Sequence, residues 1–183
     1  MVLRGESLAR AAKHWKCTPC PIRKPPAERA DLNKKMPAPR TPRDDRAQAA
    51  IAGVKEVYAD LAARPVERNC IRRTECCQFR HTGYIPWLTD AEAVVAVKAF
   101  RASGRTRLPE PADGSCPMLE ARTGKCVIYA DRPFACRTHF CEAAGGPYSR
   151  REVLDLIRRL EAISATLGGD GPRPITAALN AWM

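Results

Sequence analysis

Cysteines constrain this chain more than any other feature, because seven of them are concentrated between residues 70 and 141. An upstream group contains an adjacent pair, in the stretch NCIRRTECCQFRHTGY. The cysteines of a downstream group are separated from one another by ten, ten and five residues. In order, these cysteines are Cys70, Cys76, Cys77, Cys116, Cys126, Cys136 and Cys141. The downstream spacing predicts thiols on successive loops and turns, from which they can converge without belonging to one helix or strand.

The apolar content is low for a domain that must fold by hydrophobic burial alone. Leu, Ile, Val and Phe together account for 33 of 183 residues, about 18%, and the net charge is +11. A content below roughly 20%, combined with a strong net charge, lies near the disordered class. We therefore predict that something other than apolar burial, such as a bound metal, helps to hold the fold together.

The N-terminal stretch MVLRGESLARAAKHW has no continuous apolar run of signal-peptide length. No segment approaches the roughly 20 apolar residues of a membrane span. We therefore expect a cytoplasmic protein without a membrane partner. In a reducing compartment, nine cysteines, an odd number, favour metal or redox chemistry over a disulfide framework.

Residues 1–46 differ in composition from the rest of the chain. They hold 12 Lys and Arg against 5 Asp and Glu, and seven of the 16 prolines. This composition predicts a basic, extended arm, followed by one domain over residues 47–183. The arm contains Cys17 and Cys20 in a Cys-x-x-Cys spacing, which leaves open a metal ligand, a bridge between chains or a redox pair.

Apolar periodicity and capping signals predict helices in four segments of the domain. Two segments begin with a capping box, Thr89 with Glu92 and Ser149 with Glu152. The predicted helices cover residues 46–63, 89–104, 149–169 and 175–182, and KCVIYA at 125–130 is compatible with a short strand. Pro133 prevents a long helix in the cysteine-rich middle. The sequence therefore predicts a mainly α, small, loop-rich and metal-stabilised domain with few or no short strands.

The cysteine-rich middle also resembles a known family. Cys-Pro-x-Leu, then Cys-x-Ile-Tyr-x-x-Arg-Pro-x-x-Cys-Arg, then a further cysteine, is similar to the YkgJ-type cysteine-cluster family, described as zinc- or iron-chelating domains. The matching residues are Cys116, Pro117, Leu119, Cys126, Ile128, Tyr129, Arg132, Pro133, Cys136, Arg137 and Cys141. Cys76 and Cys77, preceded by Cys70, match the opening cluster of the family, so the resemblance covers residues 70–142.

The resemblance implies a metal site with zinc, iron or an iron–sulfur cluster as the cofactor. The implied ligands are Cys70, Cys76, Cys77, Cys116, Cys126, Cys136 and Cys141. Many members carry two cysteines before the double one, whereas here only Cys70 precedes it, which leaves an odd number of core thiols. His81, His139 or one cysteine of the arm pair are candidates for an eighth ligand, since a mixed Cys/His site is ordinary for zinc.

The adjacent cysteines and the arginines around them point to a buried, charged centre. Neighbouring side chains in extended structure face opposite ways, so Cys76 and Cys77 are predicted to serve two metal centres or both ends of one cluster. Zinc bound by four thiolates carries a net charge of about −2, which demands compensation on burial. Four arginines are placed in sequence to supply it, namely Arg72, Arg73, Arg132 and Arg137.

Three classes of function are compatible with these observations. The first is a metal-binding protein whose thiolate-rich site has a structural or redox role. The second is an iron-dependent enzyme that modifies a protein or peptide, which depends on family resemblance alone because the chain has no Gly-rich nucleotide loop and no His-Glu-x-x-His motif. The third is a nucleic-acid-binding adaptor that acts through residues 1–46, in line with a pI of about 9.5. A protein partner that binds the same residues is the alternative to nucleic acid. All three stay open at this point.

Overall fold

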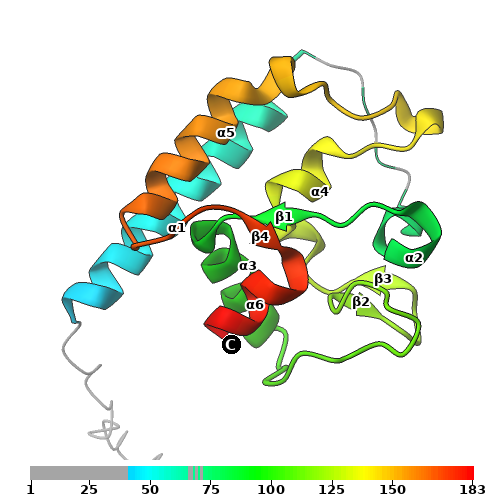
Figure 1. Ribbon diagram of the computed structural model, residues 1–183, viewed down its shortest axis with the longest axis horizontal. Coiled ribbons are helices and arrows are strands. Elements are labelled where there is room, and N and C mark those ends of the chain that lie inside the picture. The colour runs from blue at the N-terminus through cyan, green and yellow to red at the C-terminus, as the bar shows by residue number, and fades with distance from the viewer. Residues whose placement is uncertain (1–40, 66–67, 69, 71) are drawn as a thin grey trace, which may run out of the picture. The chain divides into compact units, whose positions relative to one another are not determined.

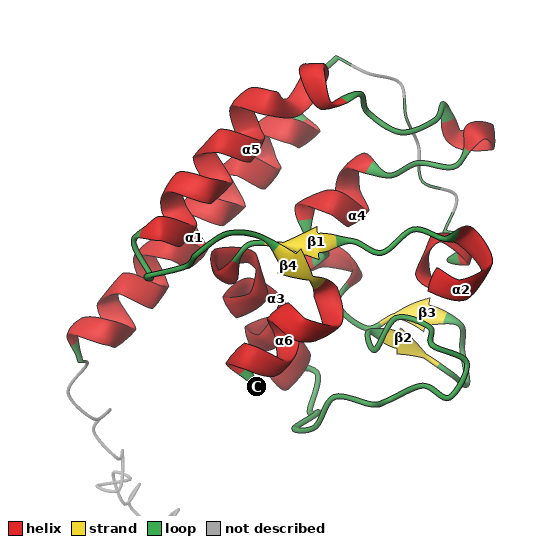
Figure 2. Ribbon diagram, viewed as in Figure 1, coloured by secondary structure: helices red, strands yellow, loops and turns green. Residues whose placement is uncertain are grey.

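The computed structural model of the protein describes residues 41–65, 68, 70 and 72–183. This described part contains six α-helices, four very short strands and three 3₁₀ turns, joined by long loops (Figure 1, Figure 2). The helices are α1 (Pro42–Ala62), α2 (Phe79–Thr82), α3 (Asp90–Ala102), α4 (Phe134–Thr138), α5 (Arg150–Ala165) and α6 (Ile175–Trp182). Residues 1–40, with most of the predicted arm and its Cys17 and Cys20, lie outside the described residues.

Helices α1 and α5 pack side by side and run antiparallel (Figure 1). Asp60 of α1 pairs with Arg159 of α5, and Arg64, just beyond α1, pairs with Asp155 at 2.6 Å. The apolar faces of both helices meet α3 in a first core cluster. Its buried members are Ala50, Ile51, Val54, Val57, Tyr58, Leu61, Ala91, Val95, Phe134, Val153, Leu156 and Leu160. The helical periodicity in the sequence thus corresponds to a buried face.

Helix α3 also belongs to a second core cluster, where it packs against α6 and the cysteine-bearing loops. The buried members of this cluster are Phe79, Leu88, Ala93, Ala96, Val97, Phe100, Cys116, Met118, Ile128, Ile175, Ala178 and Leu179. Cys77 and Cys126 are partly buried against it. The cysteines are therefore part of the packing of one half of the domain.

Two antiparallel strand pairs tie the loops to this core. β1 (Trp87–Leu88) pairs with β4 (Arg173–Pro174), directly before α6. β2 (Leu119–Glu120) pairs with β3 (Lys125–Cys126) in a hairpin. Each strand has only two residues, so the described fold is mainly α with a few short strands, as predicted.

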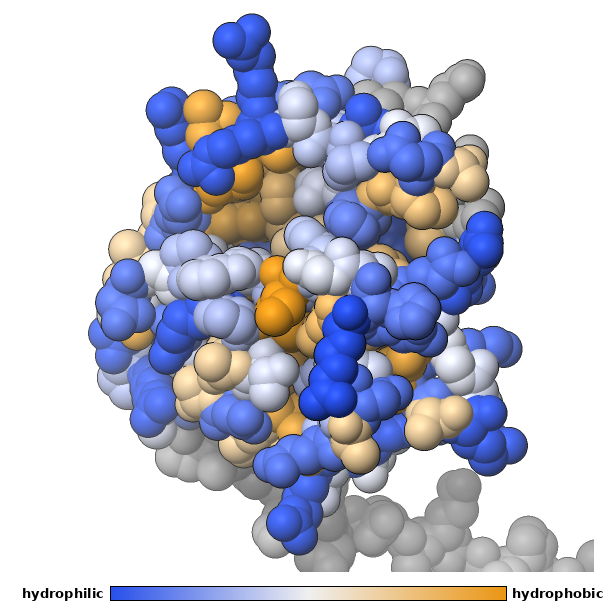
Figure 3. All heavy atoms as spheres, turned by 45° about the vertical axis from the view of Figure 1, so that its right-hand side comes forward, coloured by the Kyte–Doolittle hydropathy of each residue, from blue (hydrophilic) through white to orange (hydrophobic). Residues whose placement is uncertain are grey.

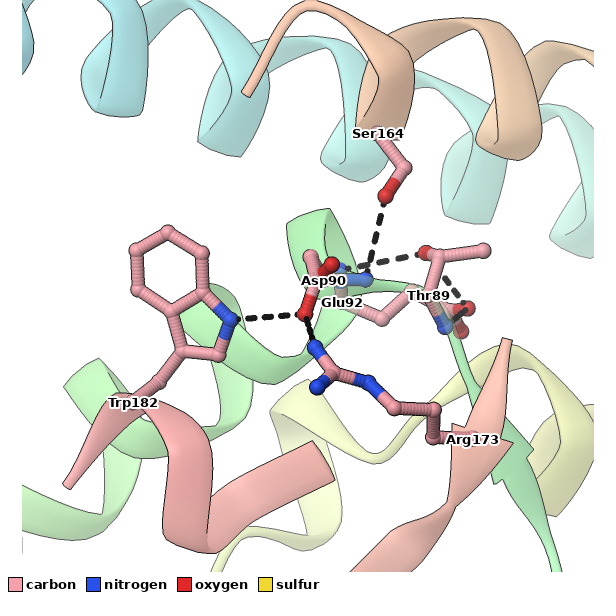
Figure 4. A network of polar contacts seen from close by, with 6 residues as sticks. All are labelled: Thr89, Asp90, Glu92, Ser164, Arg173 and Trp182. Carbon is pink, nitrogen blue, oxygen red and sulfur yellow. Dashed lines mark hydrogen bonds and ion pairs between the residues drawn. The ribbon is translucent and has the colours of Figure 1, made fainter. Parts of the chain in front are cut away.

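The N-terminus of α3 is held by a buried polar network (Figure 4). Asp90 is 4% exposed, accepts a hydrogen bond from Trp182 Nε1 at 2.8 Å and pairs with Arg173. Its backbone N–H donates to Ser164 Oγ at 3.1 Å. The network therefore fastens α3 to the end of α5 and to the C-terminal segment.

The four predicted helices are all present; α6 has the predicted bounds, and the ends of the other three are shifted. α1 begins at Pro42, before the predicted start at residue 46, because Thr41 caps it in a capping box that the prediction overlooked. The capping boxes predicted at Thr89 and Ser149 are confirmed. KCVIYA is extended only at its first two residues and continues into a 3₁₀ turn. No helix in the described part of the chain is long and apolar enough to cross a membrane.

One face of the domain has apolar surface in a hollow edged by hydrophilic side chains (Figure 3). A groove of about 440 Å³ runs between β1, α4 and α5. Ile85 and Trp87, which are 47% and 56% exposed, line it and are the large apolar side chains that the described residues leave open to solvent. This groove is separate from the cysteines.

Candidate metal centre

Six of the seven predicted ligand cysteines line one cavity beside the second core cluster. This first cavity has a volume of about 60 Å³, and roughly 10–15 Å³ suffices for a water molecule. Its lining cysteines are Cys70, Cys76, Cys77, Cys116, Cys126 and Cys136. The rest of the lining is mostly apolar. The fold therefore gathers thiols that are far apart in the sequence around one enclosed space.

The seventh cysteine, Cys141, is exposed and lines a smaller neighbouring cavity of about 40 Å³. Cys70, Cys76 and His139 line this second cavity as well as the first. His81 is exposed on α2 and lines neither cavity. Of the candidates for an eighth ligand that the structure describes, His139 is thus the one placed beside the thiols.

The double cysteine lies in a 3₁₀ turn and not in extended structure. The expectation that extended geometry points Cys76 and Cys77 in opposite directions is therefore wrong. Both side chains line the first cavity, and the two thiols are in hydrogen-bonding contact. Cys76 alone of the two also faces the second cavity.

Tertiary contacts hold this turn in place. Arg72 and Thr74, which precede it, have left-handed backbone angles, with φ of 57° and 60°. Such angles cost about 1–3 kcal/mol for a residue other than glycine. Thr74 Oγ1 donates to Gly124 O at 3.0 Å, and the N–H of Cys116 donates to Cys77 O at 2.8 Å. These bonds lock the double cysteine onto the β2–β3 hairpin and the loop before it.

Cys136 is positioned by α4, which begins directly after Pro133. The first N–H of this helix, that of Phe134, donates to Glu92 Oε1 at 2.8 Å. Glu92 is 3% exposed and also closes the capping box of α3 with Thr89. Sequence reasoning identified Glu92 only as a local cap. Its link to a helix 42 residues away has no local signal.

Two of the four predicted arginines face the first cavity. Arg72 and Arg132 line it, and both guanidinium groups stack on the Tyr129 ring, at 4.5 and 4.4 Å from its centroid. Their positive charges therefore lie where buried thiolates need compensation.

The other two arginines are directed elsewhere. Arg73 is more than half exposed and pairs with Glu75 at 2.8 Å. Arg137 donates from Nε to Arg132 O at 2.7 Å and stacks on the Tyr58 ring. The prediction that all four compensate the site is thus not supported for these two, although Arg137 fixes the loop that carries Arg132.

The thiols differ in how readily they ionise. Burial raises the pKa of Cys70, but hydrogen bonds from the Arg72 backbone and the Tyr129 hydroxyl outweigh it, so that the pKa is lowered overall. In contrast, the hydrogen bond with Cys116, together with burial, raises the pKa of Cys77 to about 12. Thiolates packed this closely repel one another, which favours the protonated form. A cation bound between them favours the thiolates instead.

The donor set has the chemistry of a zinc or iron site, because soft thiolates suit both metals. As the side chains stand, no three Cys, His, Asp or Glu residues of the described chain are arranged to hold a metal ion. Cys76 instead lies against Cys77, and Cys77 lies against Cys116. Ligation therefore requires these short side chains to rotate about χ1 toward a common point.

His139 is held by an aromatic contact that the sequence did not reveal. Its ring stacks on Tyr84, with 4.0 Å between centroids and 11° between planes. The Tyr84 hydroxyl donates to Ala135 O at 3.1 Å, which ties the pair to α4. Burial lowers the pKa of His139, which favours the neutral imidazole. Neutral imidazole is the form that binds metals.

Thiols from separate loops and short helices around one enclosed space define a helical cysteine-cluster domain. Residues 68–153 match the family model CxxCxxCC, described as "Putative zinc- or iron-chelating domain". The match confirms the YkgJ-type resemblance and extends it on both sides of residues 70–142. No curated protein and no solved structure matches the chain.

The pattern in the name of the family locates the missing cysteine. When Cys-x-x-Cys-x-x-Cys-Cys is laid on Cys70, Cys76 and Cys77, its second cysteine falls on Arg73. Arg73 lines the second cavity and not the first. Arginine in place of cysteine at position 73 thus leaves the second cavity one thiol short, whereas the first cavity keeps all of its thiols.

Proposed function

We propose that the cysteine-cluster segment binds zinc or iron through thiolates, and that the metal has a structural role in the second core cluster. The observation that carries this proposal is the convergence of six cysteines on one cavity. Cys116 is itself a buried member of the second core cluster, and Cys77 and Cys126 pack against that cluster. A metal held there is part of the interior of the domain.

The two cavities support a division of the ligands into two sites. Four cysteines line the first cavity and not the second, and they are assigned to a four-thiolate site: Cys77, Cys116, Cys126 and Cys136. The other candidates surround the second cavity and are assigned to a mixed site: Cys70, Cys76, Cys141 and His139. His139 then takes the part of the thiol that the family pattern has at position 73. Mixed Cys/His coordination is common for zinc.

The energetic scale favours a structural role. Structural zinc contributes an apparent binding free energy of roughly 10–16 kcal/mol in small fingers. Whole domains are stable by only about 5–15 kcal/mol. A domain with so few large aliphatic residues is therefore expected to depend on its metal to fold fully.

Metal analysis of the full chain, purified without oxygen, tests this proposal. We expect two equivalents of zinc or iron in the wild-type protein, and acid-labile sulfide together with visible absorption distinguishes an iron–sulfur cluster from zinc. Cys77→Ser is expected to remove the first equivalent and lower the melting temperature. Cys141→Ser, as the matched variant, is expected to remove only the second. A wild-type protein without bound metal, or equal losses in both variants, would contradict the assignment.

A redox role is the second candidate, and the same measurement decides it. Soft thiolate sites accept iron–sulfur clusters as readily as zinc. Iron together with sulfide would favour electron transfer over a purely structural role. The iron-dependent enzyme and the nucleic-acid adaptor remain hypotheses from the sequence, and residues 1–40, on which the adaptor depends, lie outside the described chain.

A further inference from the structure

Four arginines line a pocket of about 230 Å³ near the C-terminal end of α1. They are Arg64, Arg68, Arg132 and Arg137. None of the described residues that line this pocket is acidic. Such a concentration of positive charge attracts an anion to the pocket.

Aromatic rings hold two of these guanidinium groups in fixed positions. Arg68 stacks on the Tyr148 ring at 4.1 Å from its centroid, and Arg137 stacks on Tyr58 at 4.3 Å. Stacking leaves the N–H groups of a guanidinium at the edge of its plane. Arg137 donates two of them, from Nε and Nη2, to the backbone oxygens of Arg132 and Ala130. Since both rings also line the pocket, the arginines are pre-organised around it.

The nearest carboxylates are at the solvent side and satisfy the arginines only in part. Asp155, which is 63% exposed, pairs with Arg64 at 2.6 Å. Glu152, which is 42% exposed, lies 3.6 Å from Arg68, beyond hydrogen-bonding distance. Arg68 itself is only 15% exposed. Its charge is thus largely buried, and Glu152 neutralises it through an ion pair without a close hydrogen bond.

Two guanidinium nitrogens of arginines that line this pocket have no hydrogen-bond partner within the described chain. They are Nη1 of Arg68 and Nε of Arg132, and both are inaccessible to solvent. A buried N–H of a charged group without an acceptor is costly, so such groups in native proteins need an explanation. Since both atoms are closed to solvent, an oxyanion in the pocket would compensate their charge through space and would bond to the accessible N–H groups of the same arginines.

We propose that this pocket binds the phosphate group of a small ligand. Arginines pair with phosphate through two parallel hydrogen bonds, and this geometry suits several guanidinium groups that face one space. The pocket volume is several times the roughly 30 Å³ that a water molecule occupies in the liquid, which leaves room for a phosphate group. This site does not depend on the proposed metal function, although Arg132 lines both this pocket and the first cavity.

Calorimetric titration of the full chain with inorganic phosphate, at constant ionic strength set with chloride, tests the proposal. We expect saturable binding of one phosphate per chain by the wild-type protein. Arg68→Gln is expected to weaken it at least about tenfold, the loss of one charge-assisted hydrogen bond. Arg158→Gln removes the same charge from an exposed position of α5 outside the pocket, and is expected to leave binding unchanged.

Phenyl phosphate, titrated in parallel, distinguishes the source of the phosphate group. If phenyl phosphate binds more tightly than inorganic phosphate, the ligand is a phosphate monoester whose organic part contacts the aromatic walls. If the two bind equally tightly, the ligand is free phosphate. If Arg68→Gln does not fold, as judged by circular dichroism, Arg68→Lys replaces it, since lysine keeps the charge but loses the planar fork. Absence of saturable binding by the wild-type protein would overturn the proposal. Equal affinities of the Arg68 and Arg158 variants would do the same.

Discussion

Gly169 lies against Ser164 and Asp90 of the buried network at the start of α3, where an added methyl group has no room. A Cβ atom on Gly169 would be 2.5 Å from Ser164 Oγ and 2.7 Å from Asp90 Oδ2. It would also be 3.1 Å from the backbone oxygen of Ser164. Gly169→Ala therefore forces the Ser164 or Asp90 side chain to move.

The expected loss of stability follows from two costs. Forcing an extra methyl group into a packed interior costs about 1–3 kcal/mol. Displacing the Ser164 hydroxyl leaves the Asp90 N–H buried without its acceptor, which costs a further 1–3 kcal/mol or so. We thus expect Gly169→Ala to lower the free energy of unfolding by about 2–6 kcal/mol, a large share of the roughly 5–15 kcal/mol typical of a domain.

Urea unfolding of the full chain, followed by circular dichroism, measures this loss. The double variant Ser164→Ala/Gly169→Ala is the informative comparison, because removing the hydroxyl relieves the closest contact of the new methyl group. We expect the double variant to lose less stability than the sum of the two single variants, by about 0.5–3 kcal/mol. A Gly169→Ala protein within about 0.5 kcal/mol of the wild type, or strictly additive losses, would refute the reasoning.

Three further outcomes are expected. Burial raises the pKa of Glu92 despite hydrogen bonds from Thr89 and Phe134. The carboxyl group therefore stabilises the fold most below its pKa in the unfolded chain, and this contribution is lost as the pH rises through its pKa in the folded protein. The stability difference between Glu92→Gln and wild type should therefore shift in favour of the variant from pH 4 to pH 8, as measured by urea unfolding at both values. Arg73→Cys restores the thiol of the family pattern beside the second cavity. It should raise the affinity for the second metal ion, as measured in a competition titration with a chelating dye, whereas the exposed control Arg107→Cys should not. Chelation of the metal should lower amide protection in α6 and the β2–β3 hairpin far more than in α1 and α5, as measured by hydrogen exchange.

Local signals account for most of what the sequence predicts correctly. The capping box of Thr89 and Glu92 and the apolar periodicity of α5 act within one or two turns, so their geometry is readable from a few residues. The start of α1 was missed because its own box at Thr41 lies in a segment whose prolines and charges indicate an extended arm. Pro42 in fact occupies the first turn of the helix, where proline is tolerated.

The geometry of the site was less predictable, because distant contacts determine it. The turn of Cys76 and Cys77 follows a left-handed Thr74, and no local signal marks a β-branched residue for that conformation. Its hydroxyl instead bonds to the hairpin at Gly124, 50 residues away. That the thiols gather was therefore readable from spacing and family resemblance, whereas the directions in which they point were not.

The expected confinement of metal dependence to one half of the domain follows from how the two core clusters are built. The first cluster is filled by aliphatic side chains of α1 and α5, such as Val54 and Leu156, which bury apolar surface without help. In the second cluster, α3 and α6 contribute several alanines, including Ala96 and Ala178, and the space beside them is enclosed by loops that carry thiols. These loops contain only two-residue strands and short helical turns, so metal–thiolate bonds would supply the cohesion that helix packing gives to α1 and α5. Equal loss of amide protection in both halves on chelation would show that the two clusters unfold as one unit, and would contradict this division.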